Sequence, residues 1–168
     1  MSSILDRFEE KEGDISLDAE KYLTFLVDNQ YYAFPIKDVR EIIEIQHITQ
    51  IPEFPSYAKG IIDLRNNVVP VIDVRLRFYK PEIDYTERTC IIVLDIKNIQ
   101  VGFIVDTVDE VIDISKDNIS SAPAITTDRS TRFIEGIGRV NSKIIMILNA
   151  LKMLNEEDLE AFEFMNNK

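Results

Sequence analysis

Short apolar runs separated by one or two turn residues recur along most of the chain, a pattern typical of antiparallel strands. The clearest case lies within Gly60–Phe78, where the run 61–64 is followed by Asn66 and Asn67 and then by the run 68–72. Two β-rich runs joined by two turn residues predict a hairpin. Asparagine suits its tip because it tolerates the positive φ that a tight hairpin turn requires.

The same pattern predicts the other elements of a mainly β fold. Strands are expected over residues 22–27, 31–36, 42–45, 90–96, 99–105, 108–114, 136–140 and 143–148. Apolar residues at near-helical spacing predict a C-terminal helix over 156–168. Residues 1–19 are polar and acid-rich, which predicts a flexible tail, and the aperiodic stretch 115–132 predicts a mobile surface loop.

The second half of the chain repeats the first. Residues 29–45 align without a gap on 98–114, at an offset of 69. Residues 57–78 align on 133–154, at an offset of 76. Identical residues and apolar runs coincide in both alignments, so we interpret the halves as an internal duplication.

Each half carries about five predicted strands, joined by tight turns with no helices between them. Such strands favour small barrels over an open sheet. We expect a first barrel over about 20–80 and a second over about 88–150. Units of this size bury little surface alone, so the two barrels should pack as one body. A groove between them would be the natural place for a ligand.

Composition narrows the classes of partner. The chain has 19 basic and 30 acidic side chains, a net charge of −11 that repels phosphate backbones and anionic lipids. Nucleic acid is therefore not expected as a partner, and no apolar run approaches the length of a membrane span. The single cysteine, Cys90, fits a reducing compartment, and the N-terminus lacks the features of a signal peptide. These features predict a cytoplasmic protein without direct membrane insertion.

Side chains with catalytic or metal-binding potential are few and scattered. His47 has no second histidine or cysteine to share a metal ion, so we expect a solvated loop residue. Cys90 opens an apolar strand and is interpreted as a small buried hydrophobe rather than a nucleophile. Phosphate-binding loops and the motifs of serine and zinc hydrolases are absent from the sequence. We expect no enzyme activity, no cofactor and no metal; the alternative is a small-molecule-binding barrel or an unrecognised hydrolase.

Two charges near the predicted hairpin point to a structural contact. Glu41 lies among apolar residues and has an identical counterpart, Glu110, in the second half. Arg65 has no arginine counterpart, because Asn141 stands at the equivalent position. We expect Arg65 to form an ion pair with Glu41, since an unpaired buried charge costs several kcal/mol. The alternative is that both side chains are solvated and unrelated, as we expect for Asp63.

Four stretches of the sequence stand out for their order and separation. They are F-P-I-K-D-V-R-E-I at 34–42, G-I-I-D-L-R-N-N-V-V-P-V-I-D-V-R-L-R-F at 60–78, V-G-F-I-V-D-T-V-D-E-V at 101–111, and I-E-G-I-G-R-V with I-I-M-I-L at 134–148. Together they resemble the CheW-like proteins of bacterial chemotaxis, over about residues 20–155. The chain departs from the family pattern at Asn66, where a turn glycine is usual, and at Asn149, where aspartate is usual.

The resemblance implies two intimately packed five-stranded Src-homology-3-like barrels related by a pseudo-two-fold axis, with short helices and a C-terminal helix. It also implies a non-catalytic adaptor that couples membrane chemoreceptors to the chemotaxis histidine kinase, whose regulatory domain has the same fold. We expect a monomer in dilute solution, recruited from the cytoplasm to receptor arrays at the inner face of the membrane. The same fold occurs fused to a receiver domain or within the kinase, and from the span of Met1 to Lys168 we expect neither neighbour.

The resemblance places the cytoplasmic tip of the receptor in the groove between the barrels and the kinase regulatory domain at the barrel ends. Matching positions for the receptor contact are Val39, Glu41, Arg65, Val68, Gly102 and Val108. Gly102 is included because a bare backbone allows close approach of a partner helix. For the kinase contact the resemblance gives no residue-level prediction.

Overall fold

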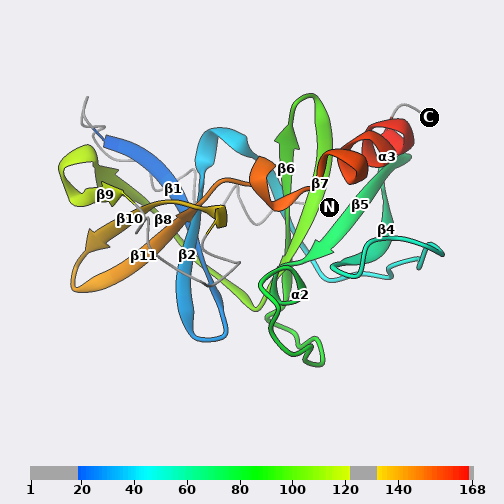
Figure 1. Cartoon of the computed structure of the whole chain (residues 1–168). Coiled ribbons are helices and arrows are strands. Elements are labelled where there is room, and N and C mark those ends of the chain that lie inside the picture. Colours follow the sequence, from blue (N-terminus) through cyan, green and yellow to red (C-terminus); the bar gives the residue numbers. More distant parts are fainter. Residues whose placement is uncertain (1–18, 122–131, 167–168) are drawn as a thin grey trace.

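The computed structural model describes residues 19–121 and 132–166, and these form mainly β structure (Figure 1). The strands are β1 (Ala19–Val27), β2 (Gln30–Pro35), β3 (Val39–Glu44), β4 (Ala58–Leu64), β5 (Asn67–Asp73), β6 (Cys90–Ile96), β7 (Ile99–Val105), β8 (Thr107–Ser115), β9 (Ile119–Ser121), β10 (Ile134–Val140) and β11 (Lys143–Leu148). The helical elements are η1 (Ile36–Asp38), α2 (Val74–Arg77), η2 (Lys116–Asn118), η4 (Leu151–Met153) and α3 (Glu156–Asn166).

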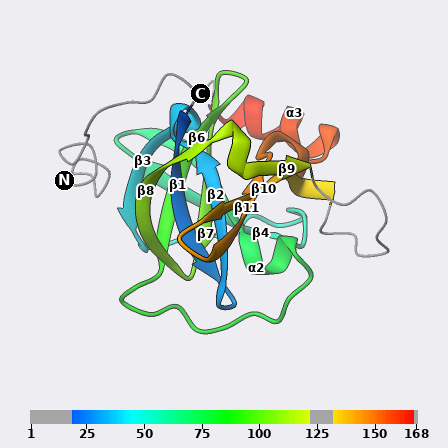
Figure 2. The same cartoon turned by 90° about the vertical axis from the view of Figure 1, so that its left-hand side faces the viewer.

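The strands form two sheets that lie side by side, as the two perpendicular views show (Figure 1, Figure 2). Sheet A has the order β8-β1-β2-β11-β10-β9, and sheet B has the order β3-β6-β7-β5-β4. Two sheets with short helices and a C-terminal helix confirm the predicted mainly β fold class.

The prediction of a mobile loop over 115–132 is wrong for its first part. Residues 115–121 contain the end of β8, the turn η2 and the strand β9, which pairs with β10. β9 is three residues long and has only one apolar residue, Ile119, so it shows no periodicity in the sequence. The remainder of that stretch, 122–131, and the predicted tail up to residue 18 lie outside the described residues.

The hairpin of β4 and β5 turns one residue earlier than expected. Its turn centres are Arg65 and Asn66, with φ of 51° and 69°, and Leu64 pairs with Asn67 across the turn. The carboxylate of Asp63 accepts a hydrogen bond of 3.0 Å from the backbone N–H of Asn66. Asparagine therefore fits the turn without glycine, and Arg65 is carried at the tip itself.

The two sheets share one topology but draw strands from both halves of the sequence. The repeat offsets convert the order β3-β6-β7-β5-β4 into β8-β1-β2-β11-β10, including the parallel pairing of β5 with β7, which becomes that of β11 with β2. However, the hairpin β1–β2 lies in sheet A, and its counterpart β6–β7 lies in sheet B. The sheets are thus not the contiguous segments 20–80 and 88–150. The repeat shows which strands are equivalent. It cannot show that the hairpins β1–β2 and β6–β7 have exchanged sheets, because equivalent hairpins present similar side chains to either sheet.

In each sheet, the segment that follows one edge strand, β3 in sheet B or β8 in sheet A, reaches the opposite side of the sheet and closes it into a barrel. After β3, Thr49 exchanges two backbone hydrogen bonds of 2.8 Å with Ile61 of β4. After β8, η2 leads to β9, which pairs with the last long strand, β10. The apolar interior of sheet B consists of Ile43, Ile62, Leu64, Val69, Val71, Ile91, Val93 and Ile104, and that of sheet A of Tyr22, Ala33, Ile114, Ile145 and Ile147.

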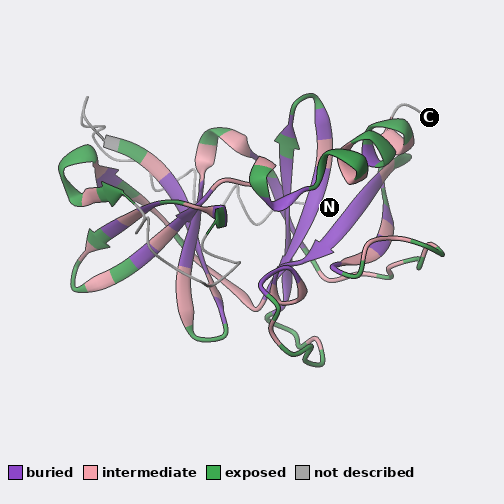
Figure 3. Cartoon of the chain, viewed as in Figure 1, coloured by how far each residue is buried: buried purple, intermediate pink, exposed green. Residues whose placement is uncertain are grey.

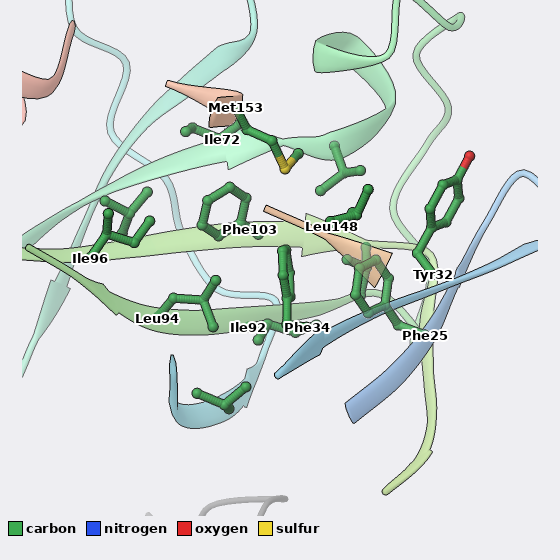
Figure 4. Packing of buried hydrophobic residues seen from close by; sticks show 14 of the residues in the cluster. Phe25, Tyr32, Phe34, Ile72, Ile92, Leu94, Ile96, Phe103, Leu148 and Met153 are labelled. Carbon is green, nitrogen blue, oxygen red and sulfur yellow. The ribbon is translucent and has the colours of Figure 1, made fainter. Parts of the chain in front are cut away.

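A further apolar core fills the space between the sheets, and Figure 4 shows side chains of this core. In Figure 3, the strand β7 is coloured as buried along most of its length. The ring of Phe34 lies 5.0 Å from that of Phe25 in sheet A and 5.3 Å from that of Phe103 in sheet B. Strands such as β6 are consequently buried on both faces, which is why they are nearly continuous apolar runs in the sequence. Most of the expected groove between the barrels is therefore occupied by side chains.

The helix α3 extends this core over sheet B. Phe162 is fully buried, and its ring lies 5.6 Å from that of Phe54. Near the end of the helix, the Asn166 side chain accepts a hydrogen bond of 2.8 Å from the Gln100 N–H and donates one of 3.3 Å to the Val68 carbonyl. Asn166 thereby joins β5 and β7 outside the short stretch over which the two strands pair.

Candidate functional site

The candidate site centres on the tip of the β4–β5 hairpin. Arg65 donates from Nη2 to Oε1 of Glu41, and the ion pair joins the tip to β3. Because β3 and β4 are the outer strands in the order of sheet B, this pair links the two edges of the sheet at one end. The structure therefore contains the contact expected between these two side chains.

The two partners differ strongly in exposure. Glu41 is 6% exposed and lies in register with Val93 and Gly102 on the neighbouring strands. The Arg65 side chain is 62% exposed. A guanidinium has five N–H donors, so one bond to Glu41 leaves others for a partner. Arg65 thus neutralises a buried carboxylate and still presents donors at the surface.

Gly102 has an internal reason to be glycine. It is buried in β7, and a Cβ there would lie 2.8 Å from Cγ2 of Ile91 and 3.5 Å from Cγ2 of Val71. Both neighbours belong to the interior of sheet B. The close approach of a partner helix that we expected at this residue therefore finds no support in its surroundings.

The predicted receptor contacts come from both sheets and differ in exposure. Arg65 and Val68 lie on one hairpin, and Arg65 contacts Glu41 of β3. Val39 is buried in the core between the sheets, whereas its repeat counterpart Val108 is half-buried on β8, in the other sheet. Within this set, Arg65 is the most exposed side chain, and Val68 and Val108 are both half-buried.

Sequence reasoning missed a polar cluster where β5 ends and α2 begins. Asp73 caps α2 by accepting hydrogen bonds of 2.9 and 3.4 Å from the N–H groups of Arg75 and Leu76, and it accepts one of 2.8 Å from the Tyr85 hydroxyl. Burial raises the pKa of Asp73 and that of Tyr85. Arg75 donates two bonds, of 2.9 and 2.8 Å, to Asp106, which raise the pKa of its guanidinium. The available signal was an aspartate directly before a helical turn, a common capping pattern.

Sequence reasoning also missed Arg77, which joins the two halves of the chain through residues that are equivalent in the repeat. It is 4% exposed, and its guanidinium carbon lies 4.3 Å from the ring centre of Tyr57 and 4.6 Å from that of Phe133. Phe133 is the counterpart of Tyr57 at the offset of 76. The Nε of Arg77 donates to the backbone carbonyl of Met153, which is the counterpart of Arg77 itself.

The candidate catalytic and metal-binding residues remain separate in the structure. His47 is exposed, and Cys90 is a buried free thiol whose pKa is raised by burial, as expected. Within 19–121 and 132–166, no three His, Cys, Asp or Glu side chains are grouped so that they could hold a metal ion. Over the same residues, none of the helices has the length and apolar character needed to cross a membrane.

Most of the chain matches the model of a known family. The family model of the CheW-like domain matches residues 21–158. This chain belongs to the CheW-like family. The matched span agrees closely with the resemblance over residues 20–155.

Relatives of similar length support the CheW-like assignment. The chemotaxis protein CheW of Bacillus subtilis is 34% identical over 142 residues, which are 84% of this chain and 91% of that protein. The chemotaxis protein CheW of Klebsiella aerogenes is 30% identical over 140 residues, which are 83% of this chain and 84% of that protein. The crystal structure of the scaffolding protein TtCheW from Thermoanaerobacter tengcongensis matches with a TM-score of 0.73 and 36% identity, covering 78% of this chain and 89% of that chain.

Proposed function

We propose that this CheW-like protein is a non-catalytic adaptor that couples membrane chemoreceptors to the chemotaxis histidine kinase. The observation that carries the proposal is the family match over 21–158, supported by likeness to a scaffolding CheW protein. The same match argues against the alternatives of a small-molecule-binding barrel and a hydrolase. The protein acts by bringing two partners together, so its function resides in surfaces rather than in a reacting group.

The receptor contact is made first by the hairpin tip. Arg65 is largely exposed and offers hydrogen-bond donors to a carboxylate or carbonyl group of the receptor's cytoplasmic tip. Val68, half-buried on the same hairpin, adds apolar surface. Glu41 is a positioning residue, because it holds Arg65. The other predicted residues, Val39, Gly102 and Val108, act by shaping the two sheets.

The kinase regulatory domain binds a different surface at a barrel end, and the adaptor is a cytoplasmic monomer recruited to the receptor array. A titration tests the two-surface arrangement directly. The protein is saturated with the purified kinase regulatory domain, and a receptor cytoplasmic fragment is then added. We expect a ternary complex in light scattering and unchanged receptor affinity. Competition between the two partners would contradict separate surfaces, and sedimentation of the protein alone checks the monomer.

A further inference from the structure

The strands β5 and β7 of sheet B pair over a short stretch that ends before the hairpin tip. Residues 71–73 of β5 lie in register with residues 102–104 of β7. The next residue towards the tip, Pro70, has no N–H group to donate to a neighbouring strand. Val68 lies beyond this point on the hairpin, so its position relative to β7 depends on contacts other than strand pairing.

The equivalent strands of sheet A, β11 and β2, pair closer to their tip. Their register joins residues 145–147 with residues 31–33, which correspond to 69–71 and 100–102 at the offsets of 76 and 69. Met146 stands at the position of Pro70 and has an N–H group. The pairing of sheet A therefore reaches further towards the tip, to the equivalent of residue 69 rather than residue 71.

The side-chain amide of Asn166 joins β5 to β7 near the tip of sheet B. Its Oδ1 accepts a hydrogen bond of 2.8 Å from the Gln100 N–H. Its Nδ2 lies 3.3 Å from the carbonyl oxygens of Val68 and Gln100, and 3.2 Å from that of Phe162. The amide thus connects the last turn of α3 with both strands, where their own pairing has ended.

The helix α3 holds Asn166 in this place, because it is itself fixed against β5 and β7 (Figure 1). Phe162, one turn before Asn166, is fully buried, and its ring lies 5.6 Å from that of Phe54. Residues four apart on a helix lie on the same face, so Phe162 turns Asn166 towards the strands. In the first half, the chain continues after α2 as the linker 80–89 and enters β6 without forming a helix.

An amide joins the equivalent carbonyl groups of sheet A, but it comes from a strand of the sheet itself. Nε2 of Gln30 in β2 donates hydrogen bonds of 3.1 Å to the Tyr31 carbonyl and of 3.3 Å to the Ile144 carbonyl. Tyr31 and Ile144 are the counterparts of Gln100 and Val68. Both sheets therefore have this amide bridge, and sheet B receives it from the C-terminal helix.

We propose that Asn166 is a positioning residue for the receptor contact, because it holds the Val68 carbonyl beside β7 and so sets where the hairpin presents Arg65. The inference rests on the proposed function, in which Arg65 and Val68 contact the receptor. Glu41 of β3 holds the same hairpin through Arg65. The tip is thus fixed from two sides. Without the amide, one side is free, and the receptor must order the tip as it binds, which lowers its affinity.

The test begins with Asn166→Leu, which removes every hydrogen bond of the side-chain amide with little change in volume. In the free protein, we expect the Gln100 N–H to exchange with solvent at least about tenfold faster. The Kd for a purified receptor cytoplasmic fragment should rise about fivefold or more. Exchange along residues 159–165 should stay unchanged, which separates a released hairpin from an undocked helix.

A second variant, Asn166→Asp, separates the two roles of the amide. A carboxylate still accepts a hydrogen bond from the Gln100 N–H but has no hydrogen to donate to the Val68 carbonyl. We therefore expect Gln100 to stay protected while the receptor affinity falls as it does in Asn166→Leu. Gln30→Leu removes the equivalent bridge of sheet A and is the matched control. It should leave the receptor Kd within about twofold of that of the unchanged protein.

The outcomes distinguish this inference from the proposed function. Unchanged receptor affinity in Asn166→Leu or Asn166→Asp would overturn the inference and leave the proposed function in place. An equal loss of affinity in Gln30→Leu would also overturn it, because the effect would then not depend on the receptor hairpin. So would fast exchange along residues 159–165 in both Asn166 variants, which would assign the loss to undocking of α3. Failure of the unchanged protein to bind the fragment would overturn the proposed function, and this inference with it.

Discussion

The two sheets share one strand order, and each has a β-bulge at the equivalent place, but different side chains hold the two bulges. In sheet B, the bulge of β3 contains Glu41, which lies opposite Val93 and is held by Arg65 from the hairpin tip. In sheet A, the bulge of β8 contains Glu110 and lies opposite Thr24. The Thr24 hydroxyl donates a bond of 2.7 Å to the Glu110 carbonyl and accepts one of 3.1 Å from its N–H.

The comparison shows that an identical residue in a repeat need not have an identical role. Glu41 is buried and Glu110 is exposed, although they occupy equivalent positions. The residue on the neighbouring strand differs: the Thr24 hydroxyl bonds the backbone of its bulge, whereas the side chain of its counterpart, Val93, has no hydrogen-bonding group. The bulge of sheet A is thus held by the Thr24 hydroxyl from a neighbouring strand. The bulge of sheet B is held by Arg65, whose side chain remains available to a partner.

The largest effect is expected for Arg77, which joins the two halves of the chain. Arg77→Ala removes a buried cation from between two aromatic rings and leaves the Met153 carbonyl without its donor. We expect a loss of about 3 kcal/mol in the free energy of unfolding, measured by urea denaturation. The exposed Arg139→Ala is the control and should cost less than about 0.5 kcal/mol. A similar small loss for Arg77→Ala would show that the joint does not depend on this cation.

The next largest effect is expected when the hydrogen bonds between Thr24 and the bulge of sheet A are removed. Thr24→Val removes both hydrogen bonds to Glu110 with little change in volume, so we expect a loss of about 2 kcal/mol in urea denaturation. The reciprocal variant, Val93→Thr, puts a hydroxyl into the interior of sheet B and should also destabilise. Stabilisation by Val93→Thr would mean that the two bulges can be fastened in the same way.

Loss of the ion pair that holds the bulge of sheet B should reduce the free energy of unfolding by less, because Arg65 is largely exposed. For Arg65→Ala we expect a loss of about 1 kcal/mol, together with loss of most receptor binding in a pull-down with a receptor fragment. Asn141→Ala, at the equivalent tip of sheet A, is the matched control and should leave receptor binding unchanged. A double-mutant cycle with Glu41→Ala measures the pair itself. Zero coupling energy would remove Glu41 as a positioning residue, and normal binding by Arg65→Ala would sink the proposed contact.

Much of the fold could be predicted because apolar runs and turn residues report directly on strands. The two residues left between the predicted strands at 97–98 and at 141–142 do form tight turns, and both centres of each turn have positive φ. The exchange of hairpins could not be predicted, since equivalent strands present similar faces to either partner. The site was accessible only in part. Glu41 and Arg65 could be paired by charge, but Tyr85 gave no signal, because its contact with Asp73 depends on the path of the linker in space.

The smallest effect concerns the pH dependence of the linker in sheet B. A hydrogen bond from Lys80, with the attraction of its charge, lowers the pKa of Asp28. Because the folded-state pKa lies below the unfolded value, the contribution is present above the unfolded pKa, about 3.9, and is lost as pH falls through the folded one. A carboxyl-detected titration by nuclear magnetic resonance should show a lowered pKa that returns towards the ordinary value in Lys80→Ala.

The meeting of Arg77 with its own counterpart bears on how such a fold can be encoded. In a two-fold symmetric dimer of identical half-chains, every residue near the axis faces a copy of itself. Arg77 would then face a second guanidinium at the position of Met153, between the same pair of rings. Two adjacent buried cations would repel each other, and the aromatic space holds one. Covalent fusion of the halves removes this constraint, because it lets one half carry arginine and the other methionine. The junction is thus a place where a single chain achieves what two identical subunits could not.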